Sequence, residues 1–184
     1  MKRKISVLFI AFLVSGTMFR QNFVTKTGHI KFYSDTPIET IEANNHAVNS
    51  ALNPKTGDFV FKILIKSFEF EKALMQEHFN ENYMESDKYP NAMFKGKVVN
   101  AGDIDFGLAG TNDAIIKGDL TIHGVTKAVE ENGTFTVKDG KIHGQSVFSV
   151  LLEDYKIKVP GAVKKQISES IEVTVDVMLE EVKP

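Results

Sequence analysis

Residues 169–180 read ESIEVTVDVMLE, and apolar side chains recur at every second position along this stretch. One phase is apolar throughout and is formed by Ile171, Val173, Val175, Val177 and Leu179. Alternation with a period of two places one set of side chains on each face of a β-strand. The stretch therefore predicts a strand with one buried face and one solvated face.

The same period of two recurs along the chain and predicts eight strands in all. Besides 169–180, the predicted strands are residues 26–34, 38–52, 58–67, 92–100, 114–123, 127–137 and 141–152. Short turns such as Asp139-Gly140 favour antiparallel neighbours, and the regular helix between strands that a parallel sheet needs is missing. The pattern predicts an all-β protein, either a closed barrel or a sandwich.

Two local features qualify this pattern. Asn132-Gly133 is a good two-residue hairpin signal, and a turn there would split the strand predicted at 127–137. Residues 71–84 (EKALMQEHFNENYM) predict a helix, with Met75, Phe79 and Tyr83 recurring every four residues. Since this helix lies between two predicted strands, it must cross the sheet or cover one end of it.

Composition bounds the class of protein. The chain has 184 residues, of which 42% are apolar, enough for one domain with a substantial core. It contains no cysteine, which excludes disulfides, thiolate metal sites and cysteine nucleophiles. Four of the 22 Lys and Arg residues lie in the first twenty positions, which leaves 18 basic against 24 acidic residues. An acidic domain without a basic stripe argues against nucleic-acid binding.

The first twenty residues have the pattern of an export signal. Lys2, Arg3 and Lys4 precede an uncharged apolar run at residues 5–16, which has the length of a signal-peptide core and is short for a membrane span. We expect a signal peptide at residues 1–20, with its cleavage position left open, and a single domain at 21–184. The exported domain would be periplasmic or secreted, with no membrane span after cleavage; an uncleaved anchor is the alternative.

A search for catalytic and metal-binding patterns is largely negative. The five histidines include no pair at the i, i+4 spacing of a helical metal site. His123 and His143, each followed by glycine, are interpreted as exposed imidazoles beside turns. No G-x-S-x-G or phosphate-binding glycine motif is present. Glu130 and Glu131 are predicted to point to opposite faces of one strand. We expect no catalytic residue, no metal and no cofactor, and hence no enzyme.

Glycines on the apolar phase predict either curvature or space. Gly96, Gly118 and Gly144 stand where a packed core would favour larger side chains. Glycine kinks let bent strands close into a barrel, whereas missing side chains leave room for a ligand inside it. The sequence is compatible with both interpretations.

The inward phase predicts an apolar ligand cavity, with Ser146 nearly alone as a polar group. The predicted lining residues are Phe32, Phe59, Phe61, Ile63, Phe94, Gly96, Ile116, Gly118, Leu120, Ile122, Phe135, Gly144, Ser146, Phe148 and Val150. Met75, Phe79 and Tyr83 of the predicted helix are candidates for a lid over one mouth, and a simple plug of the barrel end is the alternative.

Several blocks of the chain resemble the YceI-like family of exported bacterial proteins. The strongest is KGDLTIHGVTK at residues 117–127, supported by Tyr89-Pro90 before Phe94 and by FSVLLEDYKIKVP at residues 148–160. The resemblance covers about residues 28–182. It implies an eight-stranded antiparallel, lipocalin-like barrel whose apolar tunnel holds a long polyisoprenoid or similar lipid. Leu152, where family members often carry arginine, and Lys156, where glycine is common, depart from the pattern and put the head-group preference in question.

We therefore expect a non-catalytic protein that binds a long-chain lipid of the polyisoprenoid or isoprenoid-quinone type, for transport, storage or stress protection. A second hypothesis is a stress-related interaction module whose loop at residues 100–113, with Phe106 and Leu108 exposed, carries the function. A third is an enzyme acting on a lipid held in the tunnel. Members of the family sometimes pair, so a homodimer is considered, although these residues do not indicate a dimer interface.

Overall fold

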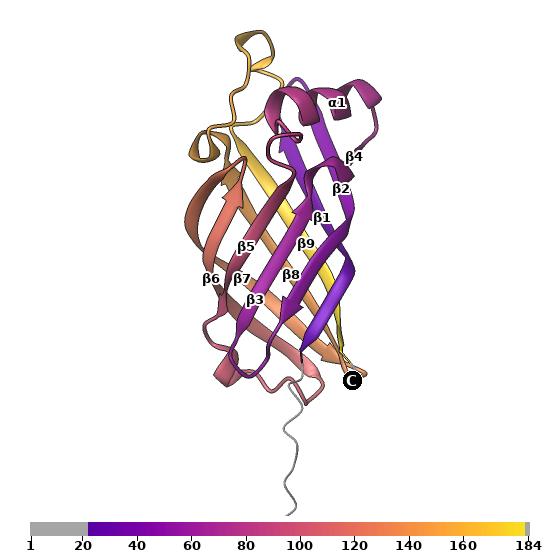
Figure 1. Ribbon diagram of the computed structural model, residues 1–184, viewed down its shortest axis with the longest axis vertical. Coiled ribbons are helices and arrows are strands. Elements are labelled where there is room, and N and C mark those ends of the chain that lie inside the picture. Colours follow the sequence, from indigo (N-terminus) through magenta and orange to yellow (C-terminus); the bar gives the residue numbers. More distant parts are fainter. Residues whose placement is uncertain (1–21, 183–184) are drawn as a thin grey trace, which may run out of the picture.

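Eight long antiparallel strands close into a barrel in the computed structural model, which describes residues 22–182 (Figure 1). The barrel strands are β1 (Phe23–Asp35), β2 (Thr40–Leu52), β3 (Asp58–Leu64), β5 (Asn91–Val98), β6 (Gly110–Ile122), β7 (Val125–Lys138), β8 (Lys141–Leu151) and β9 (Ser170–Glu181). Their order is β1-β9-β8-β7-β6-β5-β3-β2, and antiparallel pairing of β1 with β2 completes the circle. The predicted eight strands and the barrel are confirmed. The signal peptide predicted at residues 1–20 lies outside the described residues.

Alternating side chains supply the barrel core. Along β9, Val177 and Leu179 are buried, whereas the alternate residues Met178 and Glu180 are exposed. Full burial of one aliphatic side chain stabilises a fold by about 1.5–3 kcal/mol, so the inner phases of eight strands together hold the barrel closed. The period of two in the sequence therefore determines which side chains face the interior.

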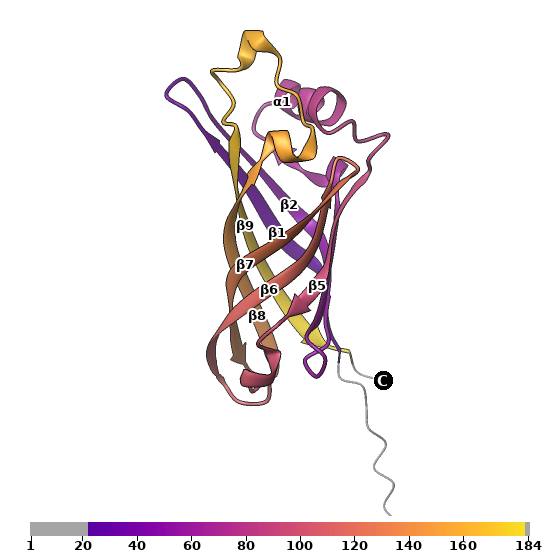
Figure 2. The same cartoon turned by 90° about the vertical axis from the view of Figure 1, so that its left-hand side faces the viewer.

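Most helical segments gather at the upper end of the barrel as drawn in Figures 1 and 2, while the turn at Ala101–Asp103 lies at the lower end. The helix α1 (Ala73–His78) continues into a π-helical turn (Phe79–Tyr83), so the helix predicted at 71–84 is confirmed with shorter ends. The two-residue strand β4 (Glu69–Phe70), which precedes α1 in the chain, pairs with β2. Short 3₁₀ turns are found at Ile65–Ser67, Ala101–Asp103, Leu152–Tyr155 and Gly161–Val163.

The helices of residues 22–182 include none with the length and apolar character needed to cross a membrane.

The strand β7 is continuous through Asn132-Gly133, so no hairpin forms there. Gly133 pairs with Ala114 of β6 on one side and with Ser146 of β8 on the other, inside the sheet. The turns lie instead at His123-Gly124 and at Asp139-Gly140, the latter as predicted. In both turns the two residues have positive φ, between 50° and 72°. Turns of this kind match the twist of the flanking strands.

The loop predicted at residues 100–113 closes the lower end of the barrel and is shorter than expected, because β6 begins at Gly110. Ile104 is buried, and the ring of Phe106 packs against that of Phe135 with 5.9 Å between centroids. The prediction that Phe106 is exposed is wrong, since its ring covers the end of the core. Leu108, at 67% exposure, does project into solvent.

Candidate functional site

Two adjoining cavities occupy the barrel interior. The upper cavity, about 270 Å³, lies beneath α1 and the segment that follows β8, and the lower cavity measures about 90 Å³. Ile30, Ile63, Leu120 and Phe148 line both, so the two compartments share a boundary along the barrel. The upper cavity is close to the lower end of the range of about 300–1,000 Å³ for small-molecule sites.

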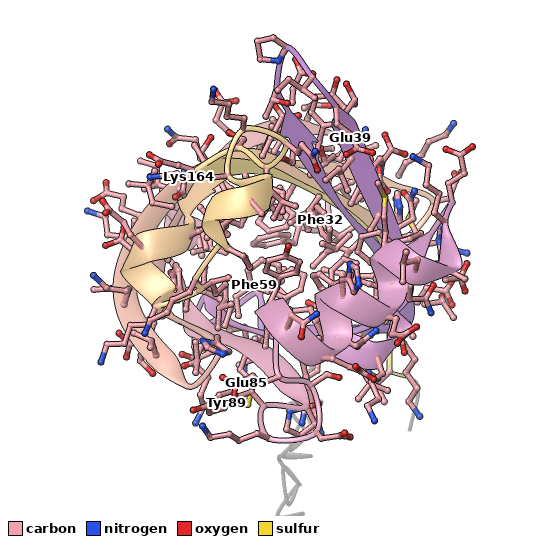
Figure 3. The ribbon with its side chains drawn as sticks, turned by 90° about the horizontal axis from the view of Figure 1, so that it is seen from above. Phe32, Glu39, Phe59, Glu85, Tyr89 and Lys164 are labelled. Atoms are coloured by element: carbon pink, nitrogen blue, oxygen red, sulfur yellow. The ribbon has the colours of Figure 1, made fainter. Side chains whose placement is uncertain are left out.

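The structure brings most of the predicted lining residues to these cavities. Phe32, Ile122 and Val150 line the upper cavity, Ile63, Leu120 and Phe148 line both, and the lower one is lined by Phe59, Phe61, Phe94, Ile116, Phe135, Gly144 and Ser146. Seen from above, Phe32 and Phe59 both point into the barrel (Figure 3). Their role in binding a ligand stays a prediction.

Gly96 and Gly118 do not line either cavity, which corrects the prediction for these two residues. They face each other across β5 and β6 as a register pair. A Cβ atom built on either would come within 3.0 Å of backbone atoms of the other strand, closer than real Cβ atoms approach. These two glycines therefore allow two strands to approach closely. They support the interpretation that glycine lets bent strands close into a barrel, and not the interpretation that it leaves room for a ligand.

Some of the lining residues that sequence analysis missed lie on strands, such as Ile30 and Val175, and others come from irregular chain over the upper end. Leu152, Ile157, Val163 and Ile167 follow β8 in a stretch with little regular structure, and all four line the upper cavity. Neither a strand nor a helix period marks such a stretch, so periodicity does not assign it to the core. The remaining signal is the recurrence of large apolar residues in a segment that is otherwise typical of a loop.

The three lid candidates, Met75, Phe79 and Tyr83, all line the upper cavity. Phe79 carries the contact with the barrel, because its ring lies 5.4 Å from Phe32 and 5.0 Å from Phe70, centroid to centroid. Offset and edge-on aromatic contacts at these distances each add about 0.5–1.5 kcal/mol beyond area burial. Phe79 thus supplies the aromatic contacts that help hold the helical segment over the upper cavity.

Phe79→Ala is expected to lower the free energy of unfolding by about 2 kcal/mol, since a fully buried Phe loses about 3–5 kcal/mol on truncation and Phe79 is half-buried. Leu74→Ala on α1 is the matched control, because Leu74 is 60% exposed and should change stability by less than about 0.5 kcal/mol. Urea unfolding followed by circular dichroism measures both. Equal stability of the two variants would show that Phe79 does not fasten the helical segment.

The upper rim is held together by His123. Its Nε2 lies 2.7 Å from a carboxylate oxygen of Glu85 and its Nδ1 lies 3.2 Å from the Tyr155 carbonyl, while its ring packs edge-on against Tyr89. The hydrogen bond with His123 lowers the pKa of Glu85 from its usual value. The His123 side chain is only 11% exposed, so the interpretation of an exposed imidazole is wrong. Figure 3 shows Glu85 and Tyr89 together at this rim.

His143 is the second histidine for which exposure was predicted. Its side chain is 30% exposed, and its Nε2 lies 2.8 Å from an oxygen of Asp176 on the neighbouring strand. Within residues 22–182, no three His, Asp or Glu side chains gather in an arrangement that could hold a metal ion.

The lower cavity also contains a carboxylate. Glu131 lies on the inward phase of β7 and lines the cavity, so Ser146 is not nearly alone as an interior polar group. Burial raises the pKa of Glu131. Burial, the charge of Asp154 and the charge of Glu131 raise the pKa of the nearby Tyr155 hydroxyl. The prediction that Glu130 and Glu131 point to opposite faces of one strand already implied that one of them faces the interior.

Glu131→Gln is expected to raise the free energy of unfolding at neutral pH. Burial raises the pKa of Glu131 in the folded state above its pKa in the unfolded chain. The ionised carboxylate therefore destabilises the fold at pH values above the folded-state pKa. This destabilisation disappears as the pH falls from the folded-state pKa to the unfolded-state pKa. The stability difference between the variant and the natural protein should therefore shrink on acidification. Urea unfolding between about pH 4 and pH 8 measures it. Glu130→Gln, on the outer face, is the control, and a gain that is independent of pH would contradict the assignment.

Comparison with known proteins places this geometry in a family. Residues 12–179 match the family model described as the YceI-like domain. A UPF0312 protein of Pseudomonas putida (strain W619) is 35% identical over 98 residues, which are 50% of this chain and 47% of that protein. The chain thus spans about half the length of the curated relative that it matches.

Solved structures share the fold at low sequence identity. A polyisoprenoid binding domain from Saccharophagus degradans superposes with a TM-score of 0.75 at 13% identity, over 88% of this chain and 98% of that chain. BcnA of Burkholderia cenocepacia gives a TM-score of 0.68 at 14% identity, over 83% and 95% of the two chains. A YCEI protein of Campylobacter jejuni gives 0.55 at 16% identity, over 100% and 92%. With a family match over nearly all of the barrel and a shared closed-barrel fold, the chain belongs to the YceI-like domain family.

Proposed function

We propose that this protein is an exported, non-catalytic binding protein that holds a long apolar lipid, of the polyisoprenoid or isoprenoid-quinone type, inside its barrel. The observation that carries the proposal is the pair of adjoining cavities, whose walls are aromatic and aliphatic side chains with few polar groups. Apolar surface buried there contributes about 25 cal/mol per Å², so a long hydrocarbon chain gains more than a short one.

Family membership supports the lipid class. The similar domain from Saccharophagus degradans is described as polyisoprenoid binding. The basic and apolar pattern of residues 1–20 supports export to the periplasm or out of the cell. Transport, storage and stress protection are the roles that a stoichiometric lipid carrier can fill without covalent chemistry.

The alternative role as an interaction module has less support. Of the loop at residues 100–113, Ile104 is buried and Phe106 packs on Phe135, so two of its apolar side chains are used in closing the barrel. Leu108 alone among these three projects far into solvent.

The test is native mass spectrometry of the mature domain purified from an exporting bacterial host, followed by extraction and identification of any bound small molecule. We expect a stoichiometric lipid with a long isoprenoid chain, and the same spectrum reports whether the domain is a monomer or a homodimer. A clean ligand-free mass that persists after challenge with isoprenoid lipids would reject the proposal and favour the interaction module.

A further inference from the structure

The barrel wall is incomplete between β7 and β8. Their ladder runs only from Lys138↔Lys141 to Gly133↔Ser146. On its other edge β7 pairs with β6 as far as Val125, and β8 pairs with β9 as far as Leu151. Residues 125–132 and 147–151 therefore border a gap in the hydrogen-bonded wall, on the side of the barrel that faces the viewer in Figure 2.

Side chains bridge this gap at its two ends. At the lower end, the Ser146 hydroxyl donates a hydrogen bond of 2.6 Å to the Asn132 carbonyl. At the upper end, the Lys127 ammonium lies 2.7 Å from a carboxylate oxygen of Asp154 in the turn after β8.

The lower cavity borders the gap. Val129 and Glu131 of β7 and Phe148 of β8 line it from the inner phase. Thr134 and Gln145 also line it; they pair with each other in the ladder directly below the gap, and the Gln145 amide donates to Asp176 on the outside of the barrel. Glu131 thus lies at the edge of the gap, and burial raises the pKa of its carboxyl group.

Among residues 22–182, Glu131 has no hydrogen-bond or ion-pair partner, although its charge is close enough to raise the pKa of the Tyr155 hydroxyl. The other carboxylate at the cavities, Glu39 in the upper one, lies 3.2 Å from the Lys72 ammonium. No Lys or Arg of the described chain lines either cavity. A half-buried carboxylate without a partner is destabilising, and a hydrogen-bond donor brought by a ligand would relieve that cost, whereas an anionic group would be repelled.

We propose that Glu131 is a ligand-recognition residue of the lower cavity, where the hydroxyl of a long, neutral lipid alcohol donates a hydrogen bond to its carboxylate and acids of the same chain are rejected. This inference rests on the lipid-binding function proposed above and adds the head-group class to it.

The test compares three probes with one isoprenoid chain: geranylgeraniol, its methyl ether, which lacks the donor, and geranylgeranoic acid, which carries a negative charge. Dissociation constants are measured by calorimetry at neutral pH for the natural protein, Glu131→Gln and Glu130→Gln. Glu130 is the matched control, since it lies on the outer face of β7 and its carboxylate pairs with Lys117 at 2.9 Å.

We expect the natural protein and Glu130→Gln to bind the alcohol at least about tenfold more tightly than the acid, and more tightly than the ether. Glu131→Gln should lose most of the discrimination against the acid. An alcohol-to-acid ratio that is the same in all three proteins, or a natural protein that prefers the acid, would overturn the inference while leaving lipid binding intact. Failure of every probe to bind any of the three proteins would overturn the proposed function and this inference together.

Discussion

Gly118→Val should destabilise the barrel by at least about 3 kcal/mol, which for a protein of ordinary stability is a large part of the total. The Cβ atom of any larger residue would lie within 3.0 Å of Gly96 Cα and of the Lys95 carbonyl oxygen on β5. These are backbone atoms, which cannot rotate away as the end of a flexible side chain can. The strands β5 and β6 would have to separate, and the hydrogen bonds of their ladder would weaken.

Gly110→Ala is the control for this prediction. Gly110 begins the same strand, and a Cβ atom built there meets nothing within 4 Å. Its stability should stay within about 0.5 kcal/mol of the natural protein. Thermal and urea unfolding followed by circular dichroism compare the variants. A Gly118→Val protein as stable as Gly110→Ala would mean that the two strands tolerate separation, and the curvature interpretation of this glycine pair would fail.

Local periodicity is why the strands could be predicted. Each of the eight stretches with a period of two became a strand, because a half-buried strand must alternate whatever its neighbours are. The helix at residues 71–84 followed from its own period in the same way. At Asn132-Gly133 a hairpin signal competed with the strand pattern, and pairing within the sheet determined the outcome. Gly133 is paired on both sides within the barrel wall, so the strand continues through it.

The candidate site was predictable only in part, since a cavity depends on how strands pair and how side chains fill the space between them. The phase of a strand places Phe32, Phe59 and Leu120 inside, and they line the cavities. The alternation along a strand does not predict whether the space beside an inward-facing glycine is empty or is filled by another side chain. At Gly144 the vacant position is occupied by the ring of Phe135, so this glycine makes room for an aromatic residue of the protein itself.

The features that sequence analysis did not predict depend on contacts between residues far apart in the chain. The gap between β7 and β8 exists because their ladder stops at Gly133 and Ser146, and no local pattern reports where two strands part. The inward carboxylate of Glu131 was implied by alternation, but its lack of a partner depends on which side chains surround it in space. The same holds for His123, which a turn would expose and which the loop at Glu85 and Tyr89 instead covers.

Leu120→Trp should weaken binding of a long apolar ligand such as geranylgeraniol at least about tenfold while the barrel stays folded. Leu120 is 8% exposed and lines both cavities, so a larger side chain here fills the space that joins them. A tenfold loss corresponds to about 1.4 kcal/mol, which equals the burial of about 60 Å² of hydrocarbon. An indole ring displaces at least that much ligand surface from the interior.

Ile115→Trp is the matched control, because Ile115 lies on the outer face of the same strand at 37% exposure. The natural chain contains no tryptophan, so the indole of each variant also reports ligand binding by its own fluorescence. Overpacking at Leu120 costs about 1–3 kcal/mol, and Leu120→Phe is the smaller substitution if the tryptophan variant does not fold. A folded Leu120 variant that binds the alcohol as tightly as Ile115→Trp does would place the ligand outside the barrel. In that case the adjoining cavities would be packing defects of the fold, and the outer surface would carry the function.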